Sequence, residues 1–263
     1  MGDQFEDIRY ETGEGIATIT IDRPDVYNAF RGRTVDELIE AFKRAWADHS
    51  IGVVLLTGAG KRAFCTGGDQ KQRAKTGDYG PTRSGLFEVE YLHKLIREIP
   101  KPVIAVVNGY AIGGGHVLHV LCDLSIAAEH AYFGQTGPRV GSFDAGFGTA
   151  YLARVVGEKR AREIWFLCRQ YSAEEAERWG LVNRVVPGER LREEAHAWAK
   201  EVLKLSPTAL RFLKQSFNVD TEHQAGIGQL AFSGLASFVD SEEAAEGMHA
   251  FEEKREPDFS RFR

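Results

Sequence analysis

Cysteine is scarce in this chain: its 263 residues include three, Cys65, Cys122 and Cys168. The number is odd and no two of them have the C-x-x-C spacing of a zinc or redox pair, which argues against a disulfide framework. Cys122 and Cys168 lie in apolar runs and are expected in the core. No histidine is placed near Cys65 to activate its thiol. We therefore expect reduced, unreactive cysteines, as is typical of a cytoplasmic protein.

Long apolar runs and an excess of basic charge are also missing. No apolar run approaches the ~20 residues that a membrane-spanning helix needs. Residues 1–7 are acidic and lack the apolar core of a secretory signal. The formal net charge of -5 and the sequence pI of about 5.9 disfavour a sequence-independent grip on nucleic acid phosphates. We expect a cytoplasmic protein without a membrane or nucleic-acid partner.

Nucleotide and metal motifs are absent as well. The chain has no G-x-x-x-x-G-K-[ST] phosphate loop, and its glycine run at 113–115 lacks both the G-x-G-x-x-G spacing and a following acidic ribose partner. His116 and His119 are three residues apart, but no third ligand lies nearby, so packed histidines are expected. We expect no metal site.

What is present begins with short Val-, Ile- and Leu-rich runs that alternate with helical patterns. Four such runs are typical of strands buried on both faces of a parallel sheet: 16–22, 52–57, 103–107 and 124–127. Thr34-x-x-Glu37 predicts a capping box at the start of a helix. After about residue 157 the pattern is mainly helical, and N-cap serines are expected at Ser172, Ser206 and Ser241. The sequence predicts an α/β fold with a helical C-terminal region.

Two glycine turns each follow a predicted strand. Gly67-Gly68 comes after the run at 52–57, and the glycines at 113–115 come after 103–107 and open a helical run. Bare backbone amides and the dipole of a helix N-terminus favour a developing negative charge. The alternative is a pair of tight packing turns. Because both turns lie at matching strand ends, we expect their amides to converge on one carbonyl oxygen, as in an oxyanion hole.

Two segments outside the predicted core have unusual composition. The polar stretch at 71–84 shows no periodicity, and two interpretations stay open: a mobile lid beside the first glycine turn and a solvated surface loop. The end of the chain carries Phe251, Phe259 and Phe262, which is apolar for a tail and indicates contact with another subunit.

Together with Phe133-Gly-Gln135 and the segment 141–144, the glycine turns resemble those of the crotonase (enoyl-CoA hydratase/isomerase) superfamily, and the similarity runs nearly end to end. The resemblance implies a ClpP-like spiral of ββα units over residues 1–200, a helical trimerisation region over 201–263, and assembly as a trimer or a dimer of trimers. It also implies that the amides of Gly68 and Gly114 polarise the thioester carbonyl of an acyl-CoA, each lowering the barrier by about 3 kcal/mol.

The two positions that carry glutamate in the hydratases of this superfamily are Val117 and Gly137 here. Neither side chain can transfer a proton, so simple hydration of an enoyl-CoA is disfavoured. Longer motifs resemble the naphthoate synthase branch, which closes the ring of o-succinylbenzoyl-CoA by a Claisen-type condensation to 1,4-dihydroxy-2-naphthoyl-CoA in menaquinone biosynthesis. The matching segments are 28–31, 65–73, 113–119, 133–138, 141–144 and 162–169.

The resemblance to that branch assigns roles inside the site. Ser142 and Asp144 would hydrogen-bond and protonate groups on the ketone that takes part in ring formation. Because Gly137 has no carboxylate, bicarbonate would act as the base and thus as a cofactor. Its ligands would be Gln135, Thr136 and Trp165. A helix-capping role is the alternative for Asp144, and a place in the core is the alternative for Trp165.

The charged ends of the substrate also have expected partners. Lys71, Arg73 and Tyr79 would meet the benzoate carboxylate. Arg31 and, from the tail of a neighbouring subunit, Lys254 would meet the phosphates of coenzyme A. A solvated charge at a helix start is the alternative for Arg31.

One position departs from the naphthoate synthase pattern: Val239 stands where that branch has a catalytic tyrosine. The segment 216–227 and the Cys65-Thr66 pair resemble 2-ketocyclohexanecarboxyl-CoA hydrolase, which opens a ring by the reverse, retro-Claisen reaction with water. The residues that fit this relative less well are Lys71, Arg73 and Thr136, and ring closure is the preferred prediction. A hydratase or isomerase and a non-catalytic binding protein on the same fold are disfavoured alternatives.

Overall fold

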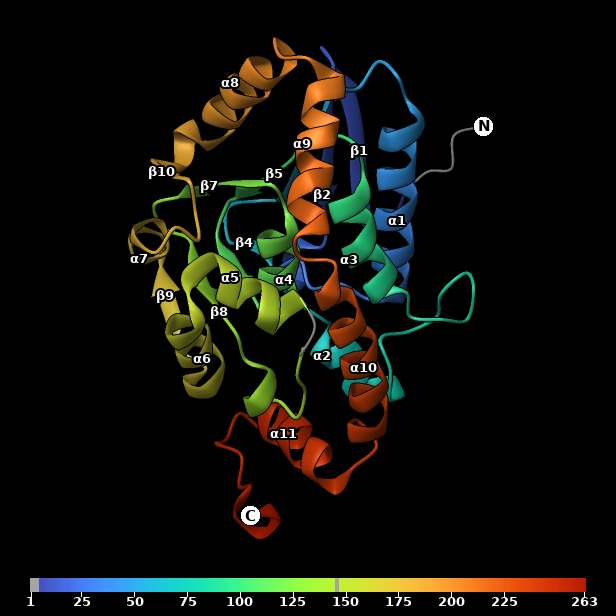
Figure 1. Cartoon of the computed structure of the whole chain (residues 1–263). Helices are drawn as coiled ribbons and strands as arrows, with labels where there is room; N and C mark the ends of the chain where they lie inside the picture. Colours follow the sequence, from blue (N-terminus) through green and yellow to red (C-terminus); the bar gives the residue numbers. More distant parts are fainter. Residues whose placement is uncertain (1–4, 145–146) are drawn as a thin grey trace.

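The computed structural model describes residues 5–144 and 147–263 and is built around a six-stranded sheet (Figure 1). In sheet order the strands are β1(Ile8–Gly13), β2(Ile16–Ile21), β3(Val53–Gly58), β5(Val103–Val107), β7(Leu124–Ala128) and β10(Arg184–Val186). β1 is antiparallel to β2, and the other neighbours are parallel. The four predicted strands are confirmed as β2, β3, β5 and β7. β1 was not predicted, because its residues after Ile8 are exposed or half-buried and form no apolar run.

A second sheet takes one strand from each repeat of the chain. Its strands, in order, are β4(Ala63–Cys65), β6(Tyr110–Ile112), β8(Tyr132–Gly134) and β9(Gln170–Ser172). β3, β5 and β7 each continue through a short turn into β4, β6 and β8, which confirms the expected spiral of strand–strand–helix units. Because β4 and β6 are parallel neighbours, the turns that follow them emerge side by side.

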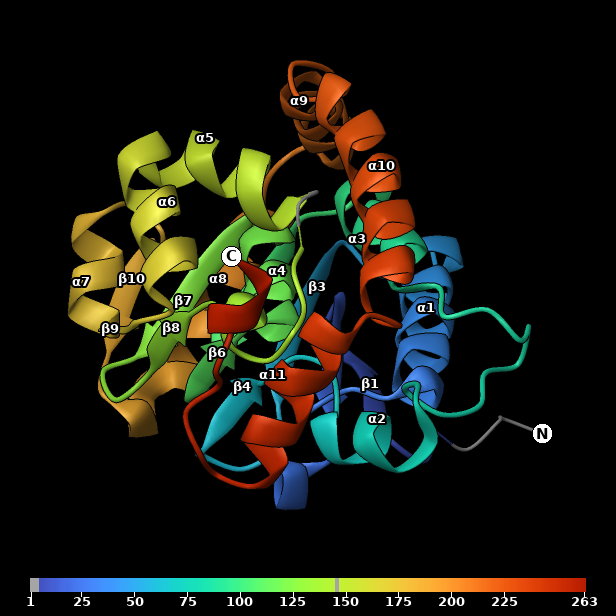
Figure 2. The same ribbon diagram turned by 90° about the horizontal axis from the view of Figure 1, so that it is seen from below.

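Helices cover both faces of the six-stranded sheet (Figures 1 and 2). Both faces are apolar because side chains alternate between the two faces along a strand. In β3, Val54 and Leu56 pack in the cluster with α1 and α3, whereas Val53 and Leu55 pack in the cluster with α8. None of the described helices is long and apolar enough to cross a membrane. The helices are α1(Gly32–Ala47), α2(Gln70–Thr76), α3(Val89–Glu98), α4(Gly114–Leu121), α5(Leu152–Val156), α6(Glu158–Leu167), α7(Ala173–Arg178), α8(Leu191–Leu203), α9(Pro207–Val219), α10(His223–Phe238) and α11(Glu242–Glu252), with short turns η1(Pro24–Val26), η2(Gly137–Arg139), η4(Gly188–Arg190), η5(Ser260–Phe262) and the π-helical turn η3(Phe147–Tyr151).

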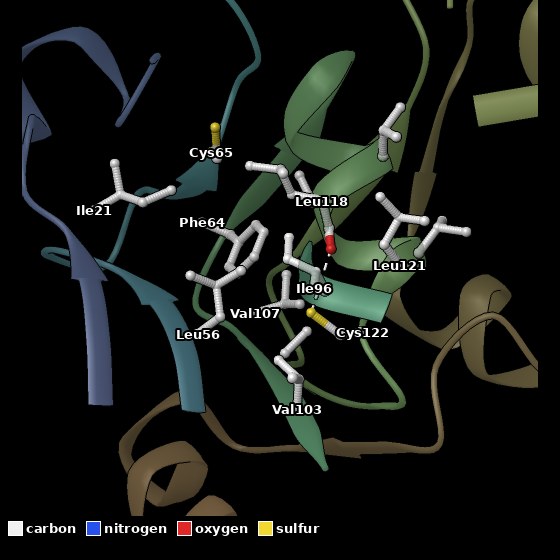
Figure 3. Close-up of a cluster of buried hydrophobic side chains, with 14 of the residues drawn as sticks. Ile21, Leu56, Phe64, Cys65, Ile96, Val103, Val107, Leu118, Leu121 and Cys122 are labelled. Atoms are coloured by element: carbon white, nitrogen blue, oxygen red, sulfur yellow. Dashed lines mark hydrogen bonds between the residues drawn. The ribbon is translucent and has the colours of Figure 1, made fainter. Parts of the chain in front are cut away.

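The larger hydrophobic cluster holds two of the three cysteines (Figure 3). Burial raises the pKa of the Cys65 thiol to about 12 and also raises the pKa of Cys122, so both stay protonated and unreactive. The core position expected for Cys122 is confirmed. The core position expected for Cys168 is wrong: this residue is half-buried and ends α6 in a left-handed conformation, with φ of 48°.

Serine caps were predicted correctly, but one helix start was not. The side chains of Ser172, Ser206 and Ser241 each accept a backbone N–H in the first turn of α7, α9 and α11. Thr34 does not cap α1. That helix begins at Gly32, and the Thr34 hydroxyl accepts from the Arg31 N–H at 3.1 Å and donates to the buried Asp7 carboxylate at 2.6 Å.

Helices α2 and α8 lie at two segment boundaries predicted from the sequence. The stretch at 71–84 is only partly a loop, because α2 occupies its first part and ends at Gly77, whose φ is 82°. The division of the chain at 200/201 falls in the last turn of α8, and it remains a prediction.

Candidate active site

The two glycine turns touch one another. Gly67 has a φ of 84°, and a methyl group added to it would lie 2.8 Å from the nitrogen of Gly114. A methyl group on Gly114 would lie 2.7 Å from Cζ of Phe30. Only glycine permits the left-handed backbone at Gly67 and this close approach. The two turns therefore lie side by side, as the matching strand ends predict, and convergence of their amides on one oxygen remains a prediction.

The amides of Gly68 and Gly114 are both left without a backbone partner. Phe30 forms a parallel bridge to Gly68, in which it accepts from Asp69 N–H and donates to Gly67 C=O, both at 2.8 Å. In a parallel bridge the central residue's own N–H points away from the partner strand. Gly114 is the first residue of α4, where an N–H has no intrahelical acceptor. Within residues 5–144 and 147–263, no acceptor is recorded for either amide.

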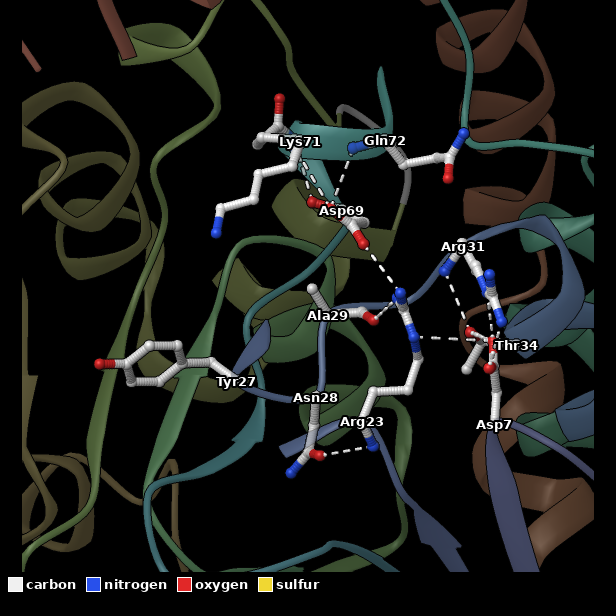
Figure 4. A network of polar contacts seen from close by, with 12 residues as sticks. Asp7, Arg23, Tyr27, Asn28, Ala29, Arg31, Thr34, Asp69, Lys71 and Gln72 are labelled. Carbon is white, nitrogen blue, oxygen red and sulfur yellow. Dashed lines mark hydrogen bonds and ion pairs between the residues drawn. The ribbon is translucent and has the colours of Figure 1, made fainter. Parts of the chain in front are cut away.

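A buried network of charges supports the first turn from beneath (Figure 4). Asp69 caps α2 by accepting from the N–H groups of Lys71 and Gln72, each at 3.1 Å. Arg23 donates to Asp69 at 2.9 Å and lies 3.7 Å from the Asp7 carboxylate. Burial alone would raise the pKa of Asp7, but hydrogen bonds from Arg31 and Thr34 outweigh it and lower that pKa. The network ties the turn to α1 and β1.

A cavity that is open to solvent lies over the two turns, with about 660 Å³ of empty space including its solvent-filled mouth. One wall is aromatic: the rings of Tyr79 and Phe87 lie 4.9 Å apart, and Phe30 packs against both. Tyr79 also covers Gly68, since a methyl group on that glycine would lie 2.4 Å from Tyr79 Cε1. Eight of the predicted site residues line the cavity: Gly68, Tyr79, Gly114, Gln135, Thr136, Ser142, Asp144 and Trp165.

Four predicted substrate-binding residues lie outside this cavity. The Arg31 guanidinium donates to both carboxylate oxygens of Asp7, at 2.8 and 2.7 Å, so Arg31 is an ion-pair partner rather than a solvated charge. Lys71 is exposed on α2. Arg73 is only 4% exposed and donates to Gly141 C=O at 3.3 Å. Lys254 is exposed beyond α11. Contacts of these four with a carboxylate or with coenzyme A remain predictions.

The two positions that would carry a hydratase glutamate hold no acid. Val117 is fully buried in α4. A methyl group on Gly137 would lie 2.7 Å from Ser142 C=O and 3.2 Å from the Trp165 ring, so a longer side chain does not fit there without rearrangement. Proton transfer must come from other groups.

The residues expected to hold bicarbonate do not fit it as they are arranged. The Trp165 indole N–H donates to Gly148 C=O at 2.6 Å, and the Gln135 amide nitrogen lies 3.1 Å from His116 Nδ1. The Ser142 carbonyl and the Trp165 ring occupy the space beside Gly137. Thr136 alone of the expected set has no side-chain partner recorded among the described residues. We route no chemical step through bicarbonate, and its role stays a prediction.

Asp144 holds the capping position that the sequence offered as its alternative, and its catalytic role remains a prediction. Its Oδ1 accepts from Gly148 N–H at 3.2 Å, which caps the turn η3. The same side chain is half-buried and lines the cavity beside Ser142. Ser142 is fixed by its own N–H, which donates to Gly137 C=O at 2.9 Å. The carboxylate is thus held by the backbone at the wall of the cavity.

Sequence reasoning missed several residues of the cavity wall, among them Phe87, His93 on α3, and Phe232 and Leu235 on α10. In the sequence His93 falls in the apolar register of Val89, Leu92 and Ile96, which was the available indication. Val239 directly follows α10, and its N–H donates to Leu235 C=O at 2.9 Å. Val239 itself does not line the cavity.

Two glycine turns side by side at an aromatic-walled cavity are the arrangement expected of an enzyme that stabilises an oxyanion. The model of the family described as enoyl-CoA hydratase/isomerase matches residues 11–261. The chain belongs to this family, the crotonase superfamily of acyl-CoA enzymes.

Solved structures of proteins named as hydratases or hydratase/isomerases are similar to this chain over nearly its whole length. An enoyl-CoA hydratase from Mycobacterium avium subsp. paratuberculosis K-10 is 28% identical, with a TM-score of 0.87 and coverage of 98% of this chain and 100% of that one. A carnitinyl-CoA hydratase from Mycobacterium avium is 30% identical, with a TM-score of 0.84 and coverage of 97% and 98%. An enoyl-CoA hydratase/isomerase from Xanthobacter autotrophicus Py2 is 32% identical, with a TM-score of 0.81 and coverage of 95% and 94%.

Proposed function

We propose that this enzyme makes or breaks a carbon–carbon bond next to the thioester of an acyl-CoA. The supporting observation is the set of residues that line the cavity: Gly68, Gly114, Ser142 and Asp144 all do so. Val117 and Gly137 stand where a hydratase has its two glutamates, so that pair of acids is missing. Ring closure of o-succinylbenzoyl-CoA to 1,4-dihydroxy-2-naphthoyl-CoA is the first candidate.

The ring-closing steps use the cavity groups in order. A proton leaves the carbon next to the thioester, and the electron pair moves onto the thioester oxygen, which the two amides stabilise. This carbon then attacks the benzoate carboxyl carbon and forms the new bond. One oxygen of that carboxyl group takes up two protons, one from the α-carbon and one from solution, relayed by Asp144 and Ser142, and leaves as water. Enolisation of the two ring ketones then gives the dihydroxy product. Closing the cavity over the substrate excludes bulk water from the enolate.

The second candidate is the reverse chemistry, in which water opens the ring of a β-keto acyl-CoA such as 2-ketocyclohexanecarboxyl-CoA. Two observations favour it. The Trp165 N–H, expected to hold bicarbonate for the synthase, is bonded to Gly148. Val239 replaces the tyrosine expected for the synthase and lies away from the cavity. Both candidates pass through the same thioester enolate, so they share the role proposed for the glycine amides.

Mass spectrometry of the products separates the candidates. We expect o-succinylbenzoyl-CoA to lose one water, with and without added bicarbonate, because the chain's own residues carry the steps above. Addition of one water to 2-ketocyclohexanecarboxyl-CoA, with o-succinylbenzoyl-CoA left intact, would reverse the order of the two candidates. Hydration of crotonyl-CoA without either cyclic reaction would contradict the proposal. The Asp144→Asn protein, purified in parallel, controls for contaminating enzymes.

We also propose, from the family resemblance, that the chain assembles as a trimer or a dimer of trimers. Apolar side chains on α9 and α10 are exposed in the single chain, among them Phe217 and Leu230, each 76% exposed. Covering such side chains is favourable at about 25 cal/mol per Å² of apolar surface. Light scattering would show the mass of three or six chains of 29.3 kDa each.

A further inference from the structure

Three titratable side chains line the cavity within the described residues: Tyr79, His93 and Asp144. The protonated hydroxyl of a tyrosine is a weak proton acceptor. Asp144 already accepts a hydrogen bond from Gly148. His93 is the remaining group, and the ring-closing steps assigned to the amides, Ser142 and Asp144 do not involve it.

His93 is buried and both of its ring nitrogens are unsatisfied. Its side chain is 1% exposed, and neither Nδ1 nor Nε2 has a hydrogen-bond partner among the described residues. The neighbours that hold the ring are apolar: Phe147 lies edge-on with ring centroids 6.5 Å apart, and Phe232 is tilted at 6.0 Å. Buried polar atoms rarely stay unpaired in native proteins, and where they do a ligand or a catalytic role is a common reason.

The surroundings of His93 keep its imidazole uncharged and therefore able to accept a proton. Burial lowers the pKa of its imidazole below the ordinary value of 6.5, while the charges of Asp144 and Glu90 act in the opposite direction. Glu90 lies one turn earlier on α3 and pairs with Lys94 at 3.2 Å. The segments packed against the His93 ring are η3, through Phe147, and α10, through Phe232. Among the described residues outside α3, Asp144 is the charged group that acts on the imidazole. At neutral pH the ring is therefore uncharged and carries a free lone pair.

We propose that His93 is the proton acceptor of this cavity, supplying the base that the hydratase glutamates provide in other members of the family. The inference rests on the proposed carbon–carbon chemistry. In ring closure the bond between hydrogen and the α-carbon of the thioester breaks: the proton goes to a ring nitrogen of His93, and the electron pair becomes the enolate held by Gly68 and Gly114. In ring opening a water molecule adds to the ring ketone and gives a proton to His93. The carbon–carbon bond then breaks toward the same enolate, the ketone carbon leaves as a carboxylic acid, and the imidazolium gives its proton to the α-carbon.

The test uses a thioester that can form the enolate but cannot close a ring. 3-Benzoylpropionyl-CoA lacks the ortho carboxylate, so exchange of its α-proton in D₂O, followed by NMR, reports proton abstraction alone. We expect His93→Gln to slow this exchange by about 10²-fold or more and to leave the Kd for the thioester within about threefold. Wild-type exchange should be constant above pH 6.5 and fall below it as the imidazole is protonated; His93→Gln should lose that dependence.

Two further variants separate a base from a structural histidine. His93→Ala should regain exchange on addition of free imidazole, because a diffusible base replaces the missing one. His119→Gln changes a histidine that is equally buried but does not line the cavity, so its exchange rate should stay near that of the wild type. Exchange within threefold of wild type in His93→Gln, or no response of His93→Ala to imidazole, would overturn the role of His93 alone. Absence of exchange in the wild-type enzyme would overturn both this role and the proposed function.

Discussion

Asp144→Asn is expected to lower kcat by about 10²- to 10⁴-fold while the Kd for the acyl-CoA changes by no more than about threefold. Asparagine keeps an oxygen that can accept from Gly148 N–H, so the cap of the turn η3 is retained. It cannot supply or take up the proton of the oxygen that leaves as water. Steady-state turnover by mass spectrometry and binding by calorimetry measure the two quantities.

The same substitution distinguishes catalysis from architecture. Because the cap is retained, the thermal unfolding midpoint of Asp144→Asn should stay within a few degrees of the wild type. A parallel fall in kcat, affinity and melting temperature would mean that the carboxylate serves chiefly to hold the turn, and the acid would then have to be sought elsewhere in the cavity.

Gly114→Ala is expected to lower kcat/KM by about 10²- to 10³-fold, the range measured when one oxyanion donor is lost. The backbone of Gly114 is helical and accepts alanine, but the added methyl group would meet the Phe30 ring at 2.7 and 2.9 Å. Relief of this contact pushes the first glycine turn, which Phe30 bridges, away from α4. The two amides would then no longer converge on one oxygen.

A matched control is available at Gly13, where a methyl group would meet nothing within 4 Å. Gly13→Ala adds the same methyl group far from the cavity and should leave kcat/KM unchanged. If Gly114→Ala retained activity within threefold, the second amide would not contribute to catalysis. If Gly13→Ala lost as much activity as Gly114→Ala, the comparison would report folding rather than the site.

The parts of the site that lie on regular elements could be predicted from the sequence. Gly67-Gly68 and Gly113-Gly114 each follow a strand of near-continuous apolar residues, and parallel strands end at the same edge, so their convergence follows from local patterns. The positions of Ser142 and Asp144 came from family resemblance, since nothing in their local pattern predicts where a loop between β8 and η3 returns to the cavity.

Other contacts depend on packing between distant segments. Arg31 was expected to meet coenzyme A, but its partner Asp7, directly before β1, is 24 residues away in the sequence and only the fold brings the two together. The Trp165 N–H was expected to bind bicarbonate, but it donates a hydrogen bond to the Gly148 carbonyl. His93 reads as an ordinary buried residue of an amphipathic helix until η3 and α10 pack around it. In each case the deciding neighbour is far away in the sequence.

The central claim is that the two glycine turns stabilise a thioester enolate. Exchange of the α-proton of 3-benzoylpropionyl-CoA into D₂O by the wild-type enzyme tests it most directly, because it requires neither the correct ring nor the correct direction of reaction. We expect exchange that saturates with thioester concentration and is at least about 10²-fold slower in Gly114→Ala. Tight binding of the thioester without any exchange above the uncatalysed rate would contradict the account.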